Sequence, residues 1–432
     1  MKPWDKGQEV DVLMEEFTVG NDRVWDERLA RWDVVASIAH ANMLGKIGLL
    51  TSAEAQTLVK TLSELLEEID QLGITIGTEY EDVHSLIEHR LIQQLGDVGK
   101  RIHIGRSRND QVAVALKMFL RHEMRQLRNV TLDLAQVMLG QAEANETLLV
   151  PGYTHMQVAM PSSFGLWYGG YAEALLEDAR VIETAIDAAN ANPLGSAAGY
   201  GSTIPLDREM TTEALNFNRL HVTSTFAQMS RGRTERICAM VMANVASTLS
   251  RFADDVVLFM SQNFGFVALP DSFTTGSSIM PHKKNPDVFE VLRARLNRLQ
   301  ALPTELSFMV ANQTSGYHRD VQFMKDRIIP MIDELRYCIH VAVHVIPHIE
   351  CKVNLMEDEK YRYAFSVDRV NELVLQGMPF RDAYRTVATE IATGAFASKP
   401  VSSNVNAHVG SIGNPGLPIL RERLKLERSR RP

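Results

Sequence analysis

The pattern of apolar and polar residues through the middle of the chain predicts several long helices. Residues 107–139 contain neither Gly nor Pro, and their Leu, Val and Met side chains recur at helical spacings. The same periodicity continues in four more segments, at 163–190, 237–259, about 287–302 and about 320–348. Helices longer than the usual 11 or 12 residues need long partners to cover their apolar faces. We therefore predict an all-α protein with an elongated central helix bundle.

The length of the chain predicts further domains beside this bundle. A chain of 432 residues exceeds the roughly 250–300 residues that one hydrophobic core supports. We expect an N-terminal helical domain at 1–106, a central long-helix bundle domain at 107–354 and a small C-terminal helical domain at 355–432.

Composition and charge exclude several functional classes. Hydrophobic residues make up 45% and no apolar run approaches the roughly 20 residues of a membrane span, so we expect no membrane partner and a cytoplasmic location. The net charge of -8 argues against nucleic-acid binding, which needs a basic surface. Cys238, Cys338 and Cys351 lack metal-ligand spacing, so we predict reduced thiols and no metal site.

Residues 275–290, TGSSIMPHKKNPDVFE, concentrate reactive side chains in a predicted loop. Gly276 allows backbone geometry that is closed to other residues, and two prolines keep helix out of the segment. Ser277 offers a hydroxyl, while Lys283 and Asn285 have the chemistry to bind a carboxylate. This combination indicates a catalytic loop.

The loop resembles that of the argininosuccinate lyases, in the fumarase and aspartase superfamily. The loop contains MP, then one residue, then KKNPD. This pattern is closer to the loop of argininosuccinate lyases than to the MPGKVNP of fumarases or the MPYKRNP of adenylosuccinate lyases. Four more segments match in the family's order: EDVHSLIEHRL from Glu81, GKRIHIGRSRNDQV from Gly99, PGYTHMQVAMP from Pro151 and GYHRDVQFMKD from Gly316. The resemblance covers most of the chain. It implies a three-domain fold and a homotetramer that shares its active sites between subunits.

The reaction implied by this resemblance is the elimination of fumarate from argininosuccinate, which yields arginine in the last step of its biosynthesis. A proton leaves the carbon next to a carboxylate and the carbon–nitrogen bond breaks, with no cofactor. Extra negative charge develops on that carboxylate in the transition state and must be stabilised. Lys283 and Asn285 are suited to this task.

Two residues compete for the proton transfers. An imidazole such as that of His155 exchanges protons near neutral pH, and in the family a glutamate matching Glu290 orients this histidine. Ser277 lies on a loop that closes over the substrate in family members, and its alkoxide would need loop amides and Lys283 for stabilisation. We favour Ser277 as the base at the carbon and His155 as the acid or water-mediated partner, with the reverse assignment left open.

The resemblance also implies a set of substrate-binding residues. They are Ser107, Arg108, Asn109, Thr154, Asn285, Tyr317, Gln322, Lys325 and His84. In the family Thr154 matches a hydroxyl that binds a carboxylate, and Tyr317, Gln322 and Lys325 match contacts to the amino-acid end of the arginine portion. His84 matches a histidine at the edge of the site.

The chain departs from the family pattern near that arginine end. The family's substrate-contacting serine near the N-terminus is replaced, which leaves Asn21 or Asp22 at its position, and the stretch from Thr223 adds Arg231 and Arg233. One hypothesis is an argininosuccinate acylated on its α-amino group, with Arg231 or Arg233 binding an extra carboxylate. Neutral drift explains the same changes, and unmodified argininosuccinate is the leading substrate.

Other readings compete with this one. Another fumarate-releasing lyase, such as adenylosuccinate lyase, is disfavoured by the KKNPD loop and the GRSRNDQ segment. A crystallin-like structural protein that has lost activity is disfavoured by the intact Ser277, Lys283, Asn285, His155 and Glu290.

Overall fold

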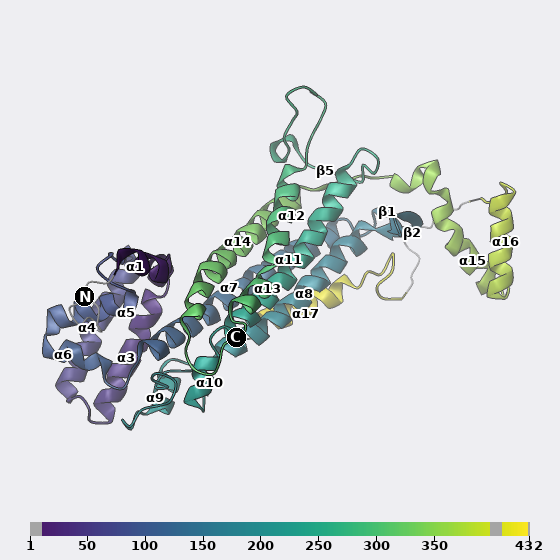
Figure 1. The fold of residues 1–432 in the computed structure, drawn as a ribbon. Helices are drawn as coiled ribbons and strands as arrows, with labels where there is room; N and C mark the ends of the chain where they lie inside the picture. The colour runs from purple at the N-terminus through teal and green to yellow at the C-terminus, as the bar shows by residue number, and fades with distance from the viewer. Residues whose placement is uncertain (1–10, 398–407, 431–432) are drawn as a thin grey trace.

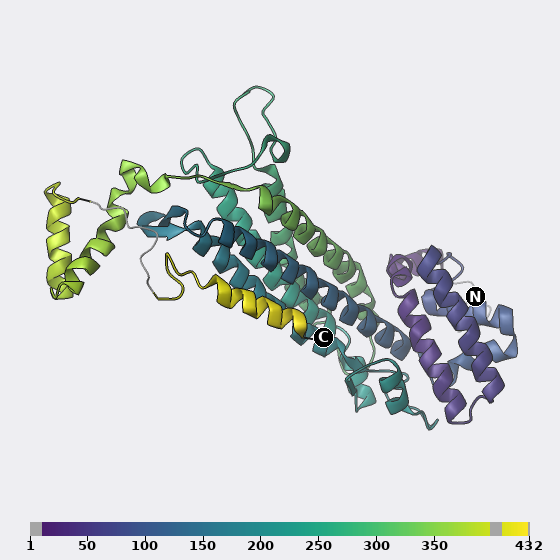
Figure 2. The same cartoon turned by 180° about the vertical axis from the view of Figure 1, so that it is seen from behind.

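The computed structural model describes residues 11–397 and 408–430, which are mostly helical (Figure 1). The molecule is elongated, with shorter helices from the N-terminal part at one end and long helices in the middle (Figures 1 and 2). Two helices, α15 (Ser366–Leu375) and α16 (Phe380–Ala392), lie at the other end. The predicted all-α fold with an elongated central bundle is confirmed.

The central part consists of long helices that run roughly side by side, together with the short helix α13 (Leu302–Met309). The long helices are α7 (Arg108–Ala144), α8 (Phe164–Ala189), α11 (Arg233–Met260), α12 (Asp287–Leu299) and α14 (Met324–Val345). Helix α7 is 37 residues long and passes through Gly140, where the sequence pattern placed its end. A single glycine costs a helix only about 1 kcal/mol relative to alanine, so packing along α8 outweighs it.

Apolar side chains from these helices form one continuous core. Helix α7 packs along α8, and α11 packs against both α8 and α12. Trp167 of α8 stacks on Phe252 of α11, with ring centroids 5.0 Å apart. The periodic apolar faces therefore explain why helices of this length lie together.

The N-terminal helices have a core of their own. They are α1 (Val12–Val19), α2 (Asp22–Glu27), α3 (Ala30–Lys46), α4 (Ser52–Leu72), α5 (Val83–Leu95) and α6 (Asp97–Lys100). Leu58, Leu62, Leu86 and Ile87 are buried in it. Because α3 also packs on α7, this cluster is joined directly to the bundle.

Short elements connect the long helices. They are the helices α9 (Arg208–Ala214) and α10 (Ser224–Met229) and the strands β1 (Leu149–Thr154), β2 (Gln157–Ser163), β3 (Ala191–Asn192), β4 (Arg219–Leu220), β5 (Val267–Ala268) and β6 (Glu350–Cys351). Strands β1 and β2 form an antiparallel hairpin, β3 pairs with β4 in parallel, and β5 pairs with β6 antiparallel.

The last helix, α17 (Leu417–Ser429), packs on α7 and α8 rather than beside α15 and α16 (Figure 2). Its Leu420 and Leu424 join the bundle core, and its Glu427 accepts a 3.1 Å hydrogen bond from the buried Arg128. Helices α15 and α16 enclose a separate small core. The division at 106 and 354 stays a prediction, and the expected C-terminal domain contains a helix that packs on the bundle.

Two other predictions concern the whole chain. Among residues 11–397 and 408–430, no helix combines the length and the apolar character that a membrane crossing demands. Cys238, Cys338 and Cys351 are all unpaired, as predicted, and the first two are buried.

Candidate active site

The structure sorts the predicted site residues into separate groups on one chain. The first group, Arg108, Asn109, Tyr317, Gln322 and Lys325, lines a single cavity. The second group, Thr154 and His155, lies on the β1–β2 hairpin. The third group, Ser277, Lys283, Asn285 and Glu290, lies in the loop before α12 and in its first turn.

The cavity of the first group has a volume of about 250 Å³ and an unusual density of charge. Its lining includes the carboxylates of Asp22, Asp26, Glu81 and Asp82 and the cations of Arg108, Arg231, Arg319 and Lys325. Four of these lining residues were not predicted as site residues: Asp26, Glu81, Asp82 and Arg319. Two of them, Glu81 and Asp82, begin one of the matched segments. A zwitterionic amino-acid end of a substrate suits this mixture of signs.

Arg108 is fixed in the cavity wall by its own chain. Its guanidinium donates hydrogen bonds to Glu81 at 2.8 Å and to Ser85 Oγ at 2.9 Å, and its Nε lies 2.8 Å from Asp82. Ion pairs of this kind hold a guanidinium in one orientation. The contacts of Arg108 within the chain therefore position the cavity wall, and substrate binding by Arg108 stays a prediction.

The start of α7 presents Asn109 to the same cavity. Ser107 caps the helix, because its Oγ accepts from the Asn109 amide at 3.3 Å while its own amide donates to Asp110 at 2.9 Å. Asp110 also accepts from the amides of Gly195 and Ala197, at 2.9 and 3.0 Å. The cap thus ties α7 to a neighbouring loop, and the role found for Ser107 is structural.

Lys325 is buried between two carboxylates. Only 2% of the residue is exposed, and its Nζ lies 2.5 Å from both Asp22 and Asp26. Burial opposes the charge of Lys325, but the two carboxylates outweigh it and raise its pKa. Burial, followed by the negative charge of Asp26, raises the pKa of Asp22 to about 7. Asn21 and Asp22 were the two candidates for the position of the family's substrate-contacting serine. Asp22 lines the cavity, whereas Asn21 is exposed.

Gln322 and His84 are also held by neighbours. The Gln322 side-chain amide donates to the carbonyl of Thr18 at 3.1 Å, which anchors the end of α1. His84 is 3% exposed, its Nδ1 lies 2.9 Å from Asp33, and it does not line the cavity. Burial disfavours the charged imidazole, but the charge of Asp33 outweighs this and raises the pKa of His84. His84 therefore lies outside the lining of this cavity, and its place at the edge of the active site stays a prediction.

The loop of the third group extends away from the bundle between β5 and α12 (Figure 1). Its base is closed by Thr275 and Asn285, since the Asn285 amide donates to the Thr275 carbonyl at 2.8 Å. Ser277 Oγ accepts from the amides of Ile279 and Met280, at 3.4 and 3.2 Å. These donors point at the atom on which an alkoxide would carry its charge.

Gly276 does not use the conformational freedom that glycine allows. Its backbone does not lie in the left-handed region. A Cβ atom there would meet only the Lys283 carbonyl oxygen, at 3.9 Å. The backbone alone therefore does not require glycine at this position.

The hairpin of the second group ends in a tight turn. His155 and Met156 both have positive φ, 52° and 59°, as in the two-residue turns that suit the twist of a hairpin. Thr154 and His155 are exposed. Among the described residues, His155 and Glu290 form neither a hydrogen bond nor an ion pair, so one chain does not assemble this predicted pair.

Helix α7 separates the first two groups. Arg108 and Asn109 lie in its first turn, whereas the hairpin follows its last turn. At 1.5 Å per residue, 37 residues extend about 55 Å. A substrate much shorter than this cannot touch both groups on one chain.

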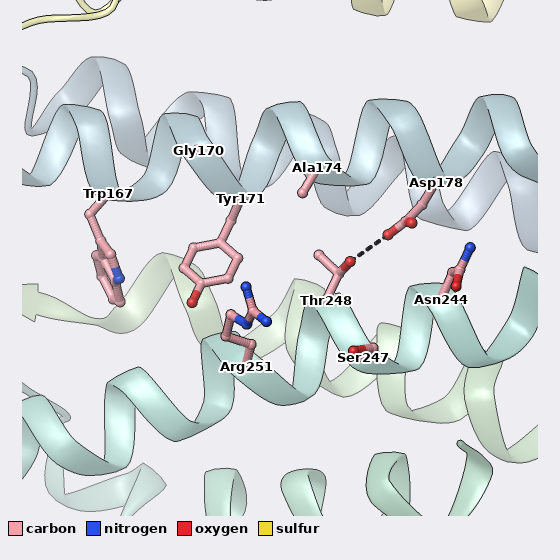
Figure 3. A pocket seen from close by; sticks show the side chains of 9 residues that line it. All are labelled: Trp167, Gly170, Tyr171, Ala174, Asp178, Asn244, Ser247, Thr248 and Arg251. Carbon is pink, nitrogen blue, oxygen red and sulfur yellow. Dashed lines mark hydrogen bonds between the residues drawn. The ribbon is translucent and has the colours of Figure 1, made fainter. Parts of the chain in front are cut away.

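A further hollow, of about 470 Å³, lies between α8 and α11 (Figure 3). Asp178 accepts a 2.7 Å hydrogen bond from Thr248 there, and burial raises the pKa of Asp178 to about 6. None of the predicted site residues lines this hollow.

Comparisons with known proteins agree with the fold. Residues 5–300 match a protein family described as Lyase. A solved structure described as EDDS lyase in complex with formate superimposes with a TM-score of 0.79 at 21% identity, covering 98% of this chain and 92% of the other. A fumarate lyase:delta crystallin from Brucella melitensis gives a TM-score of 0.70 at 19% identity, covering 93% and 91%. Fold and family match together define a helical-bundle lyase.

Sequence relatives narrow the class. An argininosuccinate lyase of Parabacteroides distasonis is 49% identical over 413 residues, covering 96% of this chain and 92% of the relative. The argininosuccinate lyase of Stenotrophomonas maltophilia is 39% identical, covering 97% of this chain and 98% of the relative. That of Thermotoga neapolitana is 38% identical, covering 90% of this chain and 97% of the relative. The chain belongs to the argininosuccinate lyase family.

Proposed function

We propose that the chain is an enzyme that eliminates fumarate from argininosuccinate and releases arginine, the last step of arginine biosynthesis. Family membership, with 49% identity to one argininosuccinate lyase, supports the reaction. The structural observation that carries it is the loop, where two backbone amides donate to Ser277 Oγ. Amide donors held in this way stabilise the alkoxide that remains once Ser277 has lost its hydroxyl proton, and this alkoxide is suited to act as a base.

The proposed mechanism divides the work between the groups. The amino-acid end of the arginine portion lies in the charged cavity beside Tyr317, Gln322 and Lys325. Ser277 takes the proton from the carbon next to the carboxylate, while Lys283 and Asn285 stabilise the charge that develops there. The carbon–nitrogen bonding pair then leaves with the guanidino nitrogen.

The remaining proposed roles complete the turnover. His155, oriented by Glu290, provides the proton transfer on the leaving side, directly or through water. Thr154 binds a carboxylate of the fumarate portion. No part of this scheme requires a cofactor or a metal.

We also propose that the working enzyme is a homotetramer whose sites are shared between subunits. The length of α7, about 55 Å, supports this, because a complete site then needs a hairpin from another copy. His155 and Glu290 do not pair with each other in the described part of the chain, which agrees with the same arrangement. A cytoplasmic location stays a prediction.

Fumarate release, followed by its ultraviolet absorbance, tests the reaction. The purified chain is expected to turn over argininosuccinate and to leave adenylosuccinate unchanged. Turnover of adenylosuccinate alone would replace the proposed function with that of the related lyase. No turnover of any fumarate-yielding substrate would support a structural role.

Coexpression of two inactive variants tests the sharing of sites. Asn109→Ala damages the charged cavity and His155→Ala damages the hairpin, so neither chain alone should be active. If every site combines these groups from different chains, random mixing should restore roughly a quarter of the wild-type activity. Activity should be measured on tetramers purified through a different tag on each chain. Absence of any recovery in such mixed tetramers would show that one chain supplies both groups.

A further inference from the structure

A second cavity adjoins the charged cavity and is rich in arginine. It has a volume of about 160 Å³ and shares Arg231 and Tyr317 with the charged cavity. Arg233 and Arg236 also line it, and no Asp or Glu belongs to the described part of its lining. We call the part formed by Arg231, Arg233 and Arg236 the arginine subsite.

Arg231 is the most buried member of the arginine subsite. It is 7% exposed, and both terminal nitrogens of its guanidinium are buried without a hydrogen-bond partner among the described residues. Its Nε lies 3.5 Å from Glu235, a long contact. Unpaired buried donors on a cation cost several kcal/mol unless something accepts from them. The geometry of Arg231 therefore points to an anion supplied from outside the chain.

The neighbours of Arg231 favour the same ligand. Arg236 Nε donates to the Gly232 carbonyl at 3.2 Å, and neither it nor the exposed Arg233 forms an ion pair within the described chain. Gln313 Nε2 lines the same cavity and is also buried without a partner. Glu235 and the carboxylates of the charged cavity, which Arg231 also lines, offset part of this positive charge. Guanidinium groups bind carboxylates through paired hydrogen bonds, which makes a carboxylate the fitting ligand.

Position relates the subsite to the substrate. Under the proposed function, on which this step rests, Tyr317 contacts the amino-acid end of the arginine portion. Tyr317 also lines both cavities. A group attached to the α-nitrogen there would pass Tyr317 and reach the three arginines. Since a water molecule takes about 30 Å³ of the liquid, the second cavity has room for a short acyl chain. We infer that the enzyme accepts argininosuccinate whose α-nitrogen carries a short acyl group ending in a carboxylate.

The chemistry of elimination is unchanged by such a group. The carbon next to the carboxylate loses its proton to the base, and the carbon–nitrogen pair leaves with the guanidino nitrogen. Fumarate and an N-acylated arginine are the products. The amide bond of the acyl group is neither formed nor broken.

Steady-state kinetics with N-succinyl-argininosuccinate and N-acetyl-argininosuccinate test this inference. The two differ in the terminal carboxylate, so the wild-type kcat/KM should be at least about tenfold higher for the succinyl form. In the double variant Arg233→Gln/Arg236→Gln, the ratio of the two values should fall toward one. A matched control, Arg381→Gln/Arg385→Gln, changes two exposed arginines of α16 and should keep the wild-type ratio.

Two outcomes with these two substrates would overturn the inference. One is an equal kcat/KM for the two acyl forms in the wild type, and the other is a preference for the succinyl form that survives in the double variant. Free succinate is the second arm of the test. If succinate inhibits the wild type but not the double variant, and N-succinyl-argininosuccinate is not turned over, the arginines bind a free dicarboxylate and the substrate assignment is wrong. Turnover of unmodified argininosuccinate distinguishes all these failures from a failure of the proposed function.

Discussion

Replacing Ser277 with alanine is expected to lower kcat for fumarate release by roughly 100- to 10,000-fold, the usual contribution of a positioned base. The hydroxyl is the acceptor for the amides of Ile279 and Met280, and alanine offers no atom there to take the proton. Fumarate absorbance measures the loss. Circular dichroism should show unchanged helix content, because the loop lies outside the bundle (Figure 1).

Ser278→Ala provides the matched control for this experiment. Ser278 is the next residue in the same loop, is exposed, and makes no hydrogen bond within the described chain. Its replacement should leave kcat within a few-fold of the wild type. Full activity of Ser277→Ala, or an equal loss in both variants, would contradict the assignment of Ser277 as the base.

Lys325→Met is expected to destabilise the protein by about 3–5 kcal/mol, the usual cost of removing one partner from a buried ion pair. The replacement leaves Asp22 and Asp26 close together without their cation, and Asp26 is fully buried. Denaturant unfolding at fixed protein concentration measures the change. The exposed Lys352→Met removes only a 4.0 Å surface contact to Glu350 and should cost less than about 1 kcal/mol.

Neutralising the carboxylates should reverse this loss. The triple variant Asp22→Asn/Asp26→Asn/Lys325→Met is expected to recover most of the stability but not the activity. The pH dependence of the free energy of unfolding gives a second check on the role of charge. The pKa of Asp22 in the folded chain, about 7, lies above its ordinary value of 3.8. Its contribution to stability is complete below about pH 4 and is lost as the pH rises to about 7. A triple variant no more stable than Lys325→Met would show that packing, not charge, explains the loss.

The helices of the bundle were predictable because their signal is local. Each apolar face repeats every three or four residues, and the segments at 163–190 and 237–259 match α8 and α11 closely. The end of α7 was missed because Gly140 reads as a helix stop, whereas packing on α8 carries the helix through it. The same tertiary effect places α17 on the bundle, since its Leu420 and Leu424 find their partners about 250–300 residues earlier in the chain.

Sequence alone determined the helical class of this protein, its family and the identity of the residues suited to the chemistry, because apolar periodicity and short motifs are written in neighbouring positions. Tertiary structure decided where those residues lie. It buried Lys325 between Asp22 and Asp26, buried His84 beside Asp33 and separated the cavity from the hairpin by the length of α7. Charge partners and distances of this kind depend on segments that meet only after folding, so no local pattern contains them.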